Sequence, residues 1–266
     1  MRFKQIIAGK AGLPEEIIPN TYQMLGKVLL LKLSHPQALK AKKKIAAAIL
    51  KTFPYVKTVA LQKGVSGEFR QPKVEIIAGE KKTLTIHKEL SCSFKLDVKK
   101  IMWSKGNHHE RKRLLRLVKP NEIIVDMFSG IGYFSLILGK LSRARRIIAI
   151  EKNPESFNFL VDNIVLNKLH NITAINDDCR NFTMKNKAER VLVGYFPGTI
   201  KFLPYALKLS KKGTIIHYHD LAADENELKR EILKVGKGKL KVLNAREVKE
   251  YSPSKRHYVF DLQFVK

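Results

Sequence analysis

The chain has 266 residues, of which 44% are hydrophobic and 28% charged, and this composition excludes a largely disordered protein. Fifty-one Lys and Arg against 24 Asp and Glu give a net charge of +27, spread along the chain and not confined to a tail. A folded protein this basic predicts a polyanionic partner, with nucleic acid first. The alternative, the lysine-rich composition of some thermophiles, would be expected to bring extra Glu as well.

Other classes of protein are not expected from the sequence. No run of eighteen uncharged apolar residues occurs, and the N-terminal apolar stretch is too short for a secretory signal, so we expect a cytoplasmic protein without membrane spans. A monomer is also expected, although no sequence feature indicates the oligomeric state. Cys92 and Cys179 are far apart and lack CxxC spacing, which argues against a disulfide framework or a zinc site. His217 and His219 of "HYHD" have strand spacing and no other plausible ligand nearby, so no metal is expected.

Residues 1–100 are predicted to form a small α+β domain with a basic surface. The expected elements are strands at 25–34 and 56–64, a helix at 35–53 opened by Pro36, and short strands at 73–79, 82–90 and 92–100. The domain contains no glycine loop and no catalytic constellation, so we expect it to position RNA. Lys42, Lys43 and Lys44 are its candidate substrate-binding residues.

Residues 101–266 alternate between strand and helix patterns and are predicted to form a second domain. Helices are expected at 108–119, 133–141, 154–169 and 200–213, and strands at 122–127, 146–151, 172–179, 190–197, 213–220, 240–252 and 257–265. The first helix should turn Leu114, Leu115 and Val118 inward and its basic residues outward; the third should bury Phe157, Leu160, Val161 and Ile164. This order predicts a doubly wound parallel sheet with an antiparallel edge.

The first strand–helix turn of this sheet, "VDMFSGIGYFSL", is the natural ligand site. It reads D-x-F-x-G-x-G through Asp126, Gly130 and Gly132, and the glycines allow the backbone to approach a ligand closely. Glu151 ends the second strand, where a carboxylate can accept from both ribose hydroxyls, and Asp178 ends the third, within reach of an adenine amino group. Together these residues predict an adenosine-shaped slot.

Two cofactors fit such a slot. A dinucleotide site would use a third glycine to bring a pyrophosphate onto the helix N-terminus, but Ser135 stands at that position. S-adenosylmethionine carries no phosphate and needs no third glycine. The sequence therefore favours S-adenosylmethionine over NAD(P), on a methyltransferase-like Rossmann sheet.

The fourth strand departs from the base methyltransferases. Enzymes that methylate amino nitrogens commonly end this strand with Asn/Asp-Pro-Pro-aromatic, whose polar side chain orients the amine. Here the strand ends "VGYFPGTIKFLP", and Gly194 occupies the position of that side chain. Glycine cannot hold a target nitrogen in line with the sulfonium methyl group.

With "SKGNHHERKR", "VDMFSGIGYFSL", "IAIEKNP", "NDDCR", "GYFPGTIKFLP" and "IIHYHD", the sequence resembles the archaeal tRNA wybutosine-synthesising aminocarboxypropyltransferases. Their near relatives, the tRNA guanine-N1 methyltransferases, carry Asn-Leu-Pro where this chain has Gly194-Tyr195-Phe196. The resemblance covers residues from about 95 to the C-terminus well and the earlier part more loosely.

The resemblance implies a site and a reaction. The implied cofactor-binding residues are Ser104, Arg111, Phe128, Gly130, Gly132, Glu151, Asp178 and Cys179, with Tyr195 as a substrate-binding candidate. Cys179 stands where relatives often carry Asn, which implies a contact through its backbone. Arg111 is the candidate cation for the transferred carboxylate, and its alternative is a solvent-facing charge.

The implied reaction is attack by a carbon of the tricyclic base, 4-demethylwyosine 3′ of the anticodon in tRNA(Phe), on the methionyl γ-carbon. It transfers 3-amino-3-carboxypropyl and releases 5′-methylthioadenosine, with no metal and no catalytic base identified. A guanine-N1 methyltransferase using the same pocket and a non-catalytic RNA-binding protein are the alternatives, and the intact Glu151 and Asp178 argue against the last.

Overall fold

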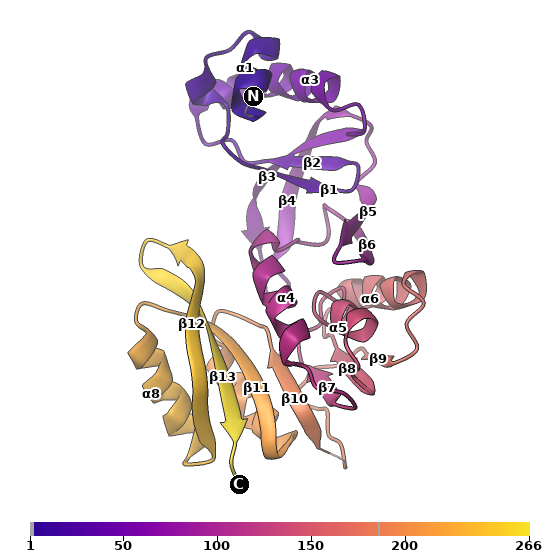
Figure 1. Ribbon diagram of the computed structural model, residues 1–266. Helices are drawn as coiled ribbons and strands as arrows, with labels where there is room; N and C mark the ends of the chain where they lie inside the picture. The colour runs from indigo at the N-terminus through magenta and orange to yellow at the C-terminus, as the bar shows by residue number, and fades with distance from the viewer. Residues whose placement is uncertain (1–2, 186) are drawn as a thin grey trace. The chain divides into compact units, whose positions relative to one another are not determined.

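The computed structural model describes residues 3–185 and 187–266 and divides the chain into two compact units, Met1–Lys105 and Gly106–Lys266 (Figure 1). In the described residues no helix is long and apolar enough to cross a membrane. The boundary between the units lies five residues after the one predicted from the sequence.

The first unit is an α+β domain with two sheets. Its elements are α1 (Phe3–Ala11), η1 (Glu15–Ile17), β1 (Tyr22–Leu25), β2 (Val28–Leu31), α2 (Pro36–Lys40), α3 (Lys42–Thr52), β3 (Thr58–Ser66), β4 (Gln71–Gly79), β5 (Leu84–Glu89) and β6 (Cys92–Asp97). The larger sheet has the order β1-β2-β3-β4, with only β2 and β3 parallel, and β5 pairs with β6.

Two local predictions for this unit were wrong, and one helix was not predicted. The strand expected at 25–34 is shorter, because Gly26 takes a positive φ of 54° and turns the chain between β1 and β2. The single helix expected at 35–53 is two helices that meet at Ala41, although Pro36 does stand at its first turn behind an N-cap by His35. Helix α1 was not predicted; it buries Ile7 in the same core as Ile45 and Ile49 of α3.

The second unit contains a seven-stranded mixed sheet. Its elements are η2 (Lys105–Asn107, which begins at the boundary), α4 (His108–Leu117), β7 (Ile123–Asp126), α5 (Ser135–Leu141), β8 (Arg146–Ile150), α6 (Pro154–Leu166), β9 (Ile172–Ile175), β10 (Ala188–Val193), η3 (Thr199–Phe202), α7 (Leu203–Lys208), β11 (Ser210–Ala222), α8 (Glu225–Gly236), β12 (Leu240–Ser252) and β13 (Lys255–Phe264). The order is β12-β13-β11-β10-β7-β8-β9. Strands β7 to β11 are parallel and β13 is antiparallel to both neighbours, which confirms the predicted fold class.

The helices of this unit differ from the prediction in three places. Helix α7 ends at Lys208, because the chain from Ser210 already pairs with β10 in the sheet. Helix α8 was missed, although Asp224 caps it by accepting from the backbone N–H of Glu227 at 2.9 Å. On α6, Val161 is 39% exposed, and the amide of Asn163 takes an inward place instead, donating to the carbonyl of Ile131 at 3.1 Å.

Alternate residues of the strands give the sheet two unlike faces. One face is apolar and packs against α7 and α8, as in Ile216 and Tyr218 of β11 and Phe260 of β13. The other face carries charged groups. Here Arg190 of β10 donates from Nε to Glu122 Oε2 at 2.7 Å and from Nη2 to Glu122 Oε1 at 2.9 Å.

The charged face extends this pair into a buried network. His217 of β11 contacts Arg190 and places Nδ1 2.6 Å from Asp261 Oδ1, and Arg113 of α4 binds Asp261 through both carboxylate oxygens. Burial lowers the pKa of His217 to about 4. Helix α4 therefore buries polar side chains: the acidic Glu110 and the basic Arg111 are each 1% exposed. This corrects the prediction for Arg111, whereas Lys112 and Arg116 are exposed as predicted.

Candidate functional site

The glycine turn after β7 has the conformation that its sequence predicts. Gly130 and Gly132 have φ values of 57° and 96°, which side chains rarely adopt. A Cβ at Gly130 would lie 2.5 Å from Cε2 of Tyr133, and one at Gly132 would lie 2.5 Å from Cγ of Leu136. Glycine is thus required at both positions.

A buried carboxylate holds the inside of the turn. Asp126, at the end of β7, accepts from the backbone N–H of Phe128 at 3.3 Å and from the hydroxyl of Ser135 at 2.6 Å. Burial raises the pKa of Asp126 to about 6, and these hydrogen bonds oppose the shift. Ser135, which stands in place of a third glycine, thus fixes the start of α5 to the end of β7.

Glu151 follows β8 and faces the turn directly. Its Oε2 accepts from the N–H of Gly130 at 2.7 Å, and its Oε1 accepts from the N–H of Asn153 at 2.8 Å. Burial raises the pKa of Glu151. An ionised carboxylate has about four acceptor positions, so each oxygen keeps a lone pair for a further donor. Two adjacent acceptors of this kind fit the two hydroxyls of a ribose.

Asp178 lies three residues after the end of β9, beside the same edge of the sheet. Arg180 donates to it from Nε at 2.9 Å and from Nη2 at 2.6 Å, and this pairing lowers the pKa of Asp178. Cys179, the residue between them, is 4% exposed and its side chain belongs to the hydrophobic core. A contact between Cys179 and a cofactor would therefore have to use its backbone.

An aromatic cluster connects the turn to the loop after β10. Phe128 of the turn stacks on Tyr195 with ring centroids 5.1 Å apart, and Phe202 packs edge-on against both. Lys201 Nζ lies 5.8 Å from the ring centroid of Tyr195 and 5.2 Å from that of Phe202. The half-buried Tyr195 therefore presents an aromatic ring beside a cation, which suits a planar base next to a phosphate.

Gly194 precedes this cluster and is not required by the fold. A Cβ built there would lie 3.5 Å from Cε2 of Phe134, an ordinary van der Waals contact. The backbone would therefore tolerate a side chain at this position, and its lack affects the space in the site and not the fold.

The remaining predicted residues lie in other places. Ser104 is half-buried near the end of the first unit, whereas Arg111 is buried within the second, which excludes its solvent-facing alternative. Their contacts with a cofactor remain predictions. Sequence reasoning also missed Arg180 and Phe202. The first could have been found from its spacing of two residues from Asp178, whereas the second lacks a local signal.

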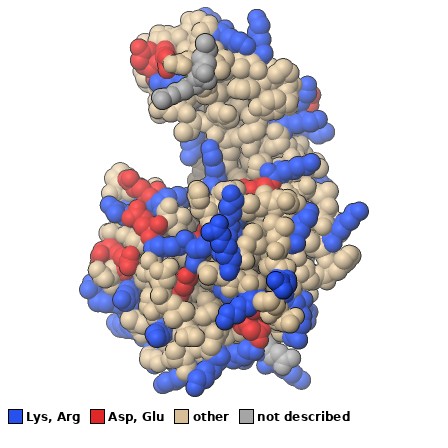
Figure 2. Space-filling model, viewed as in Figure 1, with Lys and Arg blue, Asp and Glu red and all other residues tan. Residues whose placement is uncertain are grey.

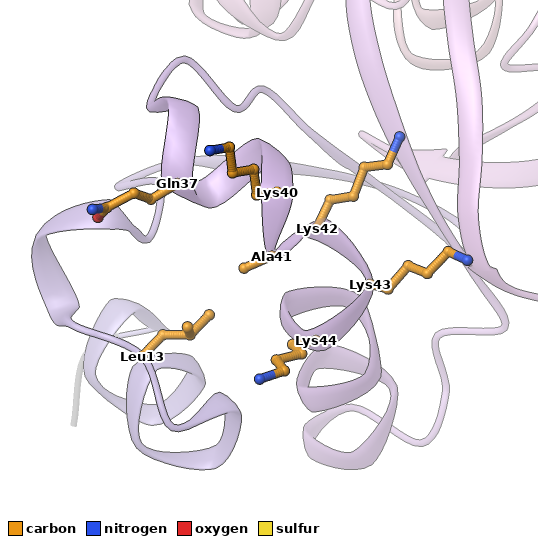
Figure 3. A pocket seen from close by; sticks show the side chains of 7 residues that line it. All are labelled: Leu13, Gln37, Lys40, Ala41, Lys42, Lys43 and Lys44. Atoms are coloured by element: carbon orange, nitrogen blue, oxygen red, sulfur yellow. The ribbon is translucent and has the colours of Figure 1, made fainter.

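The three candidate lysines of the first unit lie at a pocket. This pocket of about 420 Å³ is lined by Leu13, Gln37, Lys40, Ala41, Lys42, Lys43 and Lys44 (Figure 3). Lys42 and Lys63 both form ion pairs with Glu75. The hydrogen bond from Lys42, and to a smaller extent the one from Lys63, lowers the pKa of the Glu75 carboxyl to about 2. Lys43 and Lys44 are exposed. Figure 2 shows Lys and Arg side chains over the viewed face of both units.

Comparisons with known proteins identify the family of the chain. Residues 85–243 match the TRM5/TYW2 methyltransferase domain, and residues 3–83 match the TYW2 N-terminal domain. A tRNA(Phe) (4-demethylwyosine(37)-C(7)) aminocarboxypropyltransferase of Pyrococcus horikoshii is 39% identical over 275 residues, covering 100% of this chain and 97% of the relative. The protein of the same name from Methanocaldococcus jannaschii is 44% identical over 206 residues, covering 75% of this chain and 82% of the relative.

Two solved structures extend the likeness to three dimensions. The structure of P. horikoshii TYW2 in complex with MeSAdo is 37% identical with a TM-score of 0.86, and the alignment covers 99% of this chain and 100% of that one. The structure of M. jannaschii TYW2 in complex with AdoMet is 35% identical with a TM-score of 0.72, covering 92% and 100%. With both of its parts matched along nearly the whole length, the chain belongs to the TRM5/TYW2 family.

Proposed function

We propose that the protein transfers the 3-amino-3-carboxypropyl group of S-adenosylmethionine to 4-demethylwyosine in tRNA(Phe). The observation that carries this proposal is the 39% identity, along the whole chain, to a relative named for that reaction. The site supports it independently, because Glu151 and the glycine turn suit an adenosine and Gly194 supplies no side chain to orient a ring nitrogen.

The residues of the turn fit the donor co-substrate. Glu151 would take the ribose hydroxyls with its free lone pairs, and Gly130 and Gly132 would let the backbone approach the adenosine. Asp178 would accept from the adenine amino group, sharing its oxygens with Arg180. We assign Arg111, buried in α4, to the carboxylate of the transferred chain, where a guanidinium can form two parallel hydrogen bonds.

The main contribution of the protein to this reaction is to position the reactants. S-adenosylmethionine supplies a sulfonium whose three attached carbons are all electrophilic, and the thioether that departs is neutral and needs no general acid. The described residues have to hold the base in line with one of these carbons, and such orientation contributes about 7–11 kcal/mol in well-organised intramolecular reactions. Tyr195, stacked on Phe128, is the proposed support for the base.

Separate isotopic labels in the methyl and carboxyl groups of S-adenosylmethionine test the assignment. With tRNA bearing 4-demethylwyosine, we expect carboxyl label to enter the tRNA and methyl label to remain in the small-molecule fraction. The reason is that the aminocarboxypropyl group carries the carboxyl carbon, while the methyl group leaves on sulfur. Scintillation counting of purified tRNA and of the soluble fraction measures both.

A tRNA that carries unmodified guanosine at the same position is the matched control. It should take up neither label. Methyl label in either tRNA, without carboxyl label, would contradict the proposal and identify a methyltransferase. Label in neither tRNA, with S-adenosylmethionine still bound, would leave only an RNA-binding role and also contradict it.

The tRNA partner accounts for the +27 charge, and we assign Lys43 and Lys44 to binding its phosphates. Changing both to Glu should weaken tRNA binding and make the log–log dependence of affinity on salt shallower by roughly two units, one for each phosphate that is no longer neutralised. Affinity for S-adenosylmethionine should stay the same. Fluorescence titrations with labelled tRNA between about 50 and 200 mM salt measure the slope.

Lys42→Ala is the control for this pair. Because Lys42 is held in an ion pair with Glu75, its loss should change the salt slope less than the loss of either neighbour. An unchanged slope in the Lys43→Glu/Lys44→Glu variant would remove this pocket from the tRNA-binding surface.

A further inference from the structure

The acidic residue of the "HYHD" stretch is Asp220, whose carboxylate binds the loop after the neighbouring strand β10. Asp220 lies near the end of β11, is 4% exposed, and faces the loop that follows β10. Its Oδ1 accepts from the backbone N–H of Gly198 at 3.0 Å, and its Oδ2 accepts from that of Thr199 at 2.8 Å. The carboxylate therefore links two parallel strands across the point where the loop turns into η3.

Each oxygen of this carboxylate also accepts from its own strand. Oδ1 receives the N–H of Leu221 at 2.8 Å, and Oδ2 receives the hydroxyl of Tyr218 at 2.9 Å. Four donors thus meet the roughly four acceptor positions of an ionised carboxylate. An amide could accept through one oxygen only, and its NH2 group would face two donors. The arrangement consequently requires aspartate and not merely a small polar side chain.

The link reaches the residue proposed to support the base. Thr199, held through its N–H by Asp220, donates its hydroxyl to the carbonyl of Tyr195. The next residue, Phe196, is 5% exposed and packs on the ring of His257 with centroids 4.3 Å apart. The backbone from the carbonyl of the half-buried Tyr195 to Thr199 is therefore anchored, while the Tyr195 ring lies beside Phe128.

We propose that Asp220 is a positioning residue for the transfer: it holds the loop Gly194–Thr199 so that Tyr195 and the open position at Gly194 set the line of attack of the base. This inference rests on the proposed function. The four hydrogen bonds above join Asp220 to Gly198, Thr199, Tyr218 and Leu221 and not to the glycine turn, so its contribution should appear in turnover and not in the binding of S-adenosylmethionine.

Asp220→Asn tests this. Misplacement of a reacting group by about 1 Å reduces rates about a hundredfold, so we expect kcat for carboxyl-label transfer to fall by about that factor. The Kd for S-adenosylmethionine should stay within about twofold. Tyr218→Phe is the matched control, because it removes one strand donor to the same carboxylate and leaves both loop donors in place; its kcat should stay within about threefold.

Amide hydrogen exchange tests the same link, first in the wild-type protein alone and then in comparison with Asp220→Asn. The amides of Gly198 and Thr199 should exchange slowly, and in Asp220→Asn they should exchange at least tenfold faster while amides in the middle of β11 keep their protection. Fast exchange of both amides in the wild type would overturn the proposal. The proposal would also be overturned if Asp220→Asn and Tyr218→Phe lost kcat equally and in proportion to their loss of folded protein. Asp220 would then be a structural residue.

The two hypotheses fail in different ways. If the wild type transfers methyl label or none, the proposed function is wrong, whatever the variants do. If the wild type transfers carboxyl label and Asp220→Asn does so at the same rate, only the positioning role is wrong.

Discussion

Changing Glu122 to methionine should lower the free energy of unfolding of the second unit by about 3–5 kcal/mol, because it leaves the guanidinium of Arg190 buried without its counter-charge. Arg190 is 2% exposed and directs both Nε and Nη2 at that carboxylate. Its remaining partners, the carbonyl of Leu117 and the ring of His217, carry no negative charge. Urea unfolding followed by far-UV circular dichroism measures the loss.

A double variant separates the charge from the packing. Glu122→Met combined with Arg190→Met should be more stable than Glu122→Met alone, since it removes the uncompensated charge as well. Lys211→Met, which breaks the half-exposed pair of Lys211 with Glu189 on neighbouring strands, should cost much less. If the double variant loses as much free energy of unfolding as Glu122→Met and Arg190→Met lose together when measured singly, the Glu122–Arg190 pair is not the origin of the effect.

Glu151→Ala should weaken S-adenosylmethionine binding by roughly ten- to a hundredfold, since hydrogen bonds to a charged group contribute about 1.5–3 kcal/mol. The variant also removes the acceptor of the Gly130 and Asn153 N–H groups, so the turn itself should loosen. Glu151→Gln keeps one oxygen and should lose less affinity than the alanine variant. Isothermal titration calorimetry on folded protein gives the three dissociation constants.

Asp162→Asn serves as the charge control for this series. It removes one negative charge from the exposed face of α6, and affinity should remain that of the wild type. Should Glu151→Ala bind as tightly as the wild type, Glu151 would not contact the cofactor and the turn would need another ribose ligand.

The glycine turn could be predicted from the sequence because its determinants are local. Gly130 and Gly132 need positive φ values, and the alternation of strands and helices brings Asp126 and Glu151 to one edge of the sheet. The spacing within a strand likewise separates His217 from Tyr218, although the sequence does not say what lies on either face.

The features that were not predictable depend on distant pairs. Glu122 and Arg190 are 68 residues apart, and Arg113 and Asp261 are 148 residues apart, so no local sequence pattern predicts either pair. The same reason explains why Arg113 of α4 was expected to face outward: besides Glu110 of its own helix, it binds Asp261 of the distant β13. Asp220 stood in the quoted "HYHD" stretch, but no role was predicted for it, since its four donors come together only in the folded loop.

The burial of Cys179 has a chemical consequence for a protein whose co-substrate is an alkylating agent. Burial raises the pKa of this thiol to about 12, and the side chain is 4% exposed in the hydrophobic core next to Asp178. The thiolate is the nucleophilic form of cysteine, and at neutral pH almost none of it exists at such a pKa. The sulfur of Cys179 is in this way kept in its weakly nucleophilic thiol form, although it lies next to a residue predicted to bind the alkylating co-substrate.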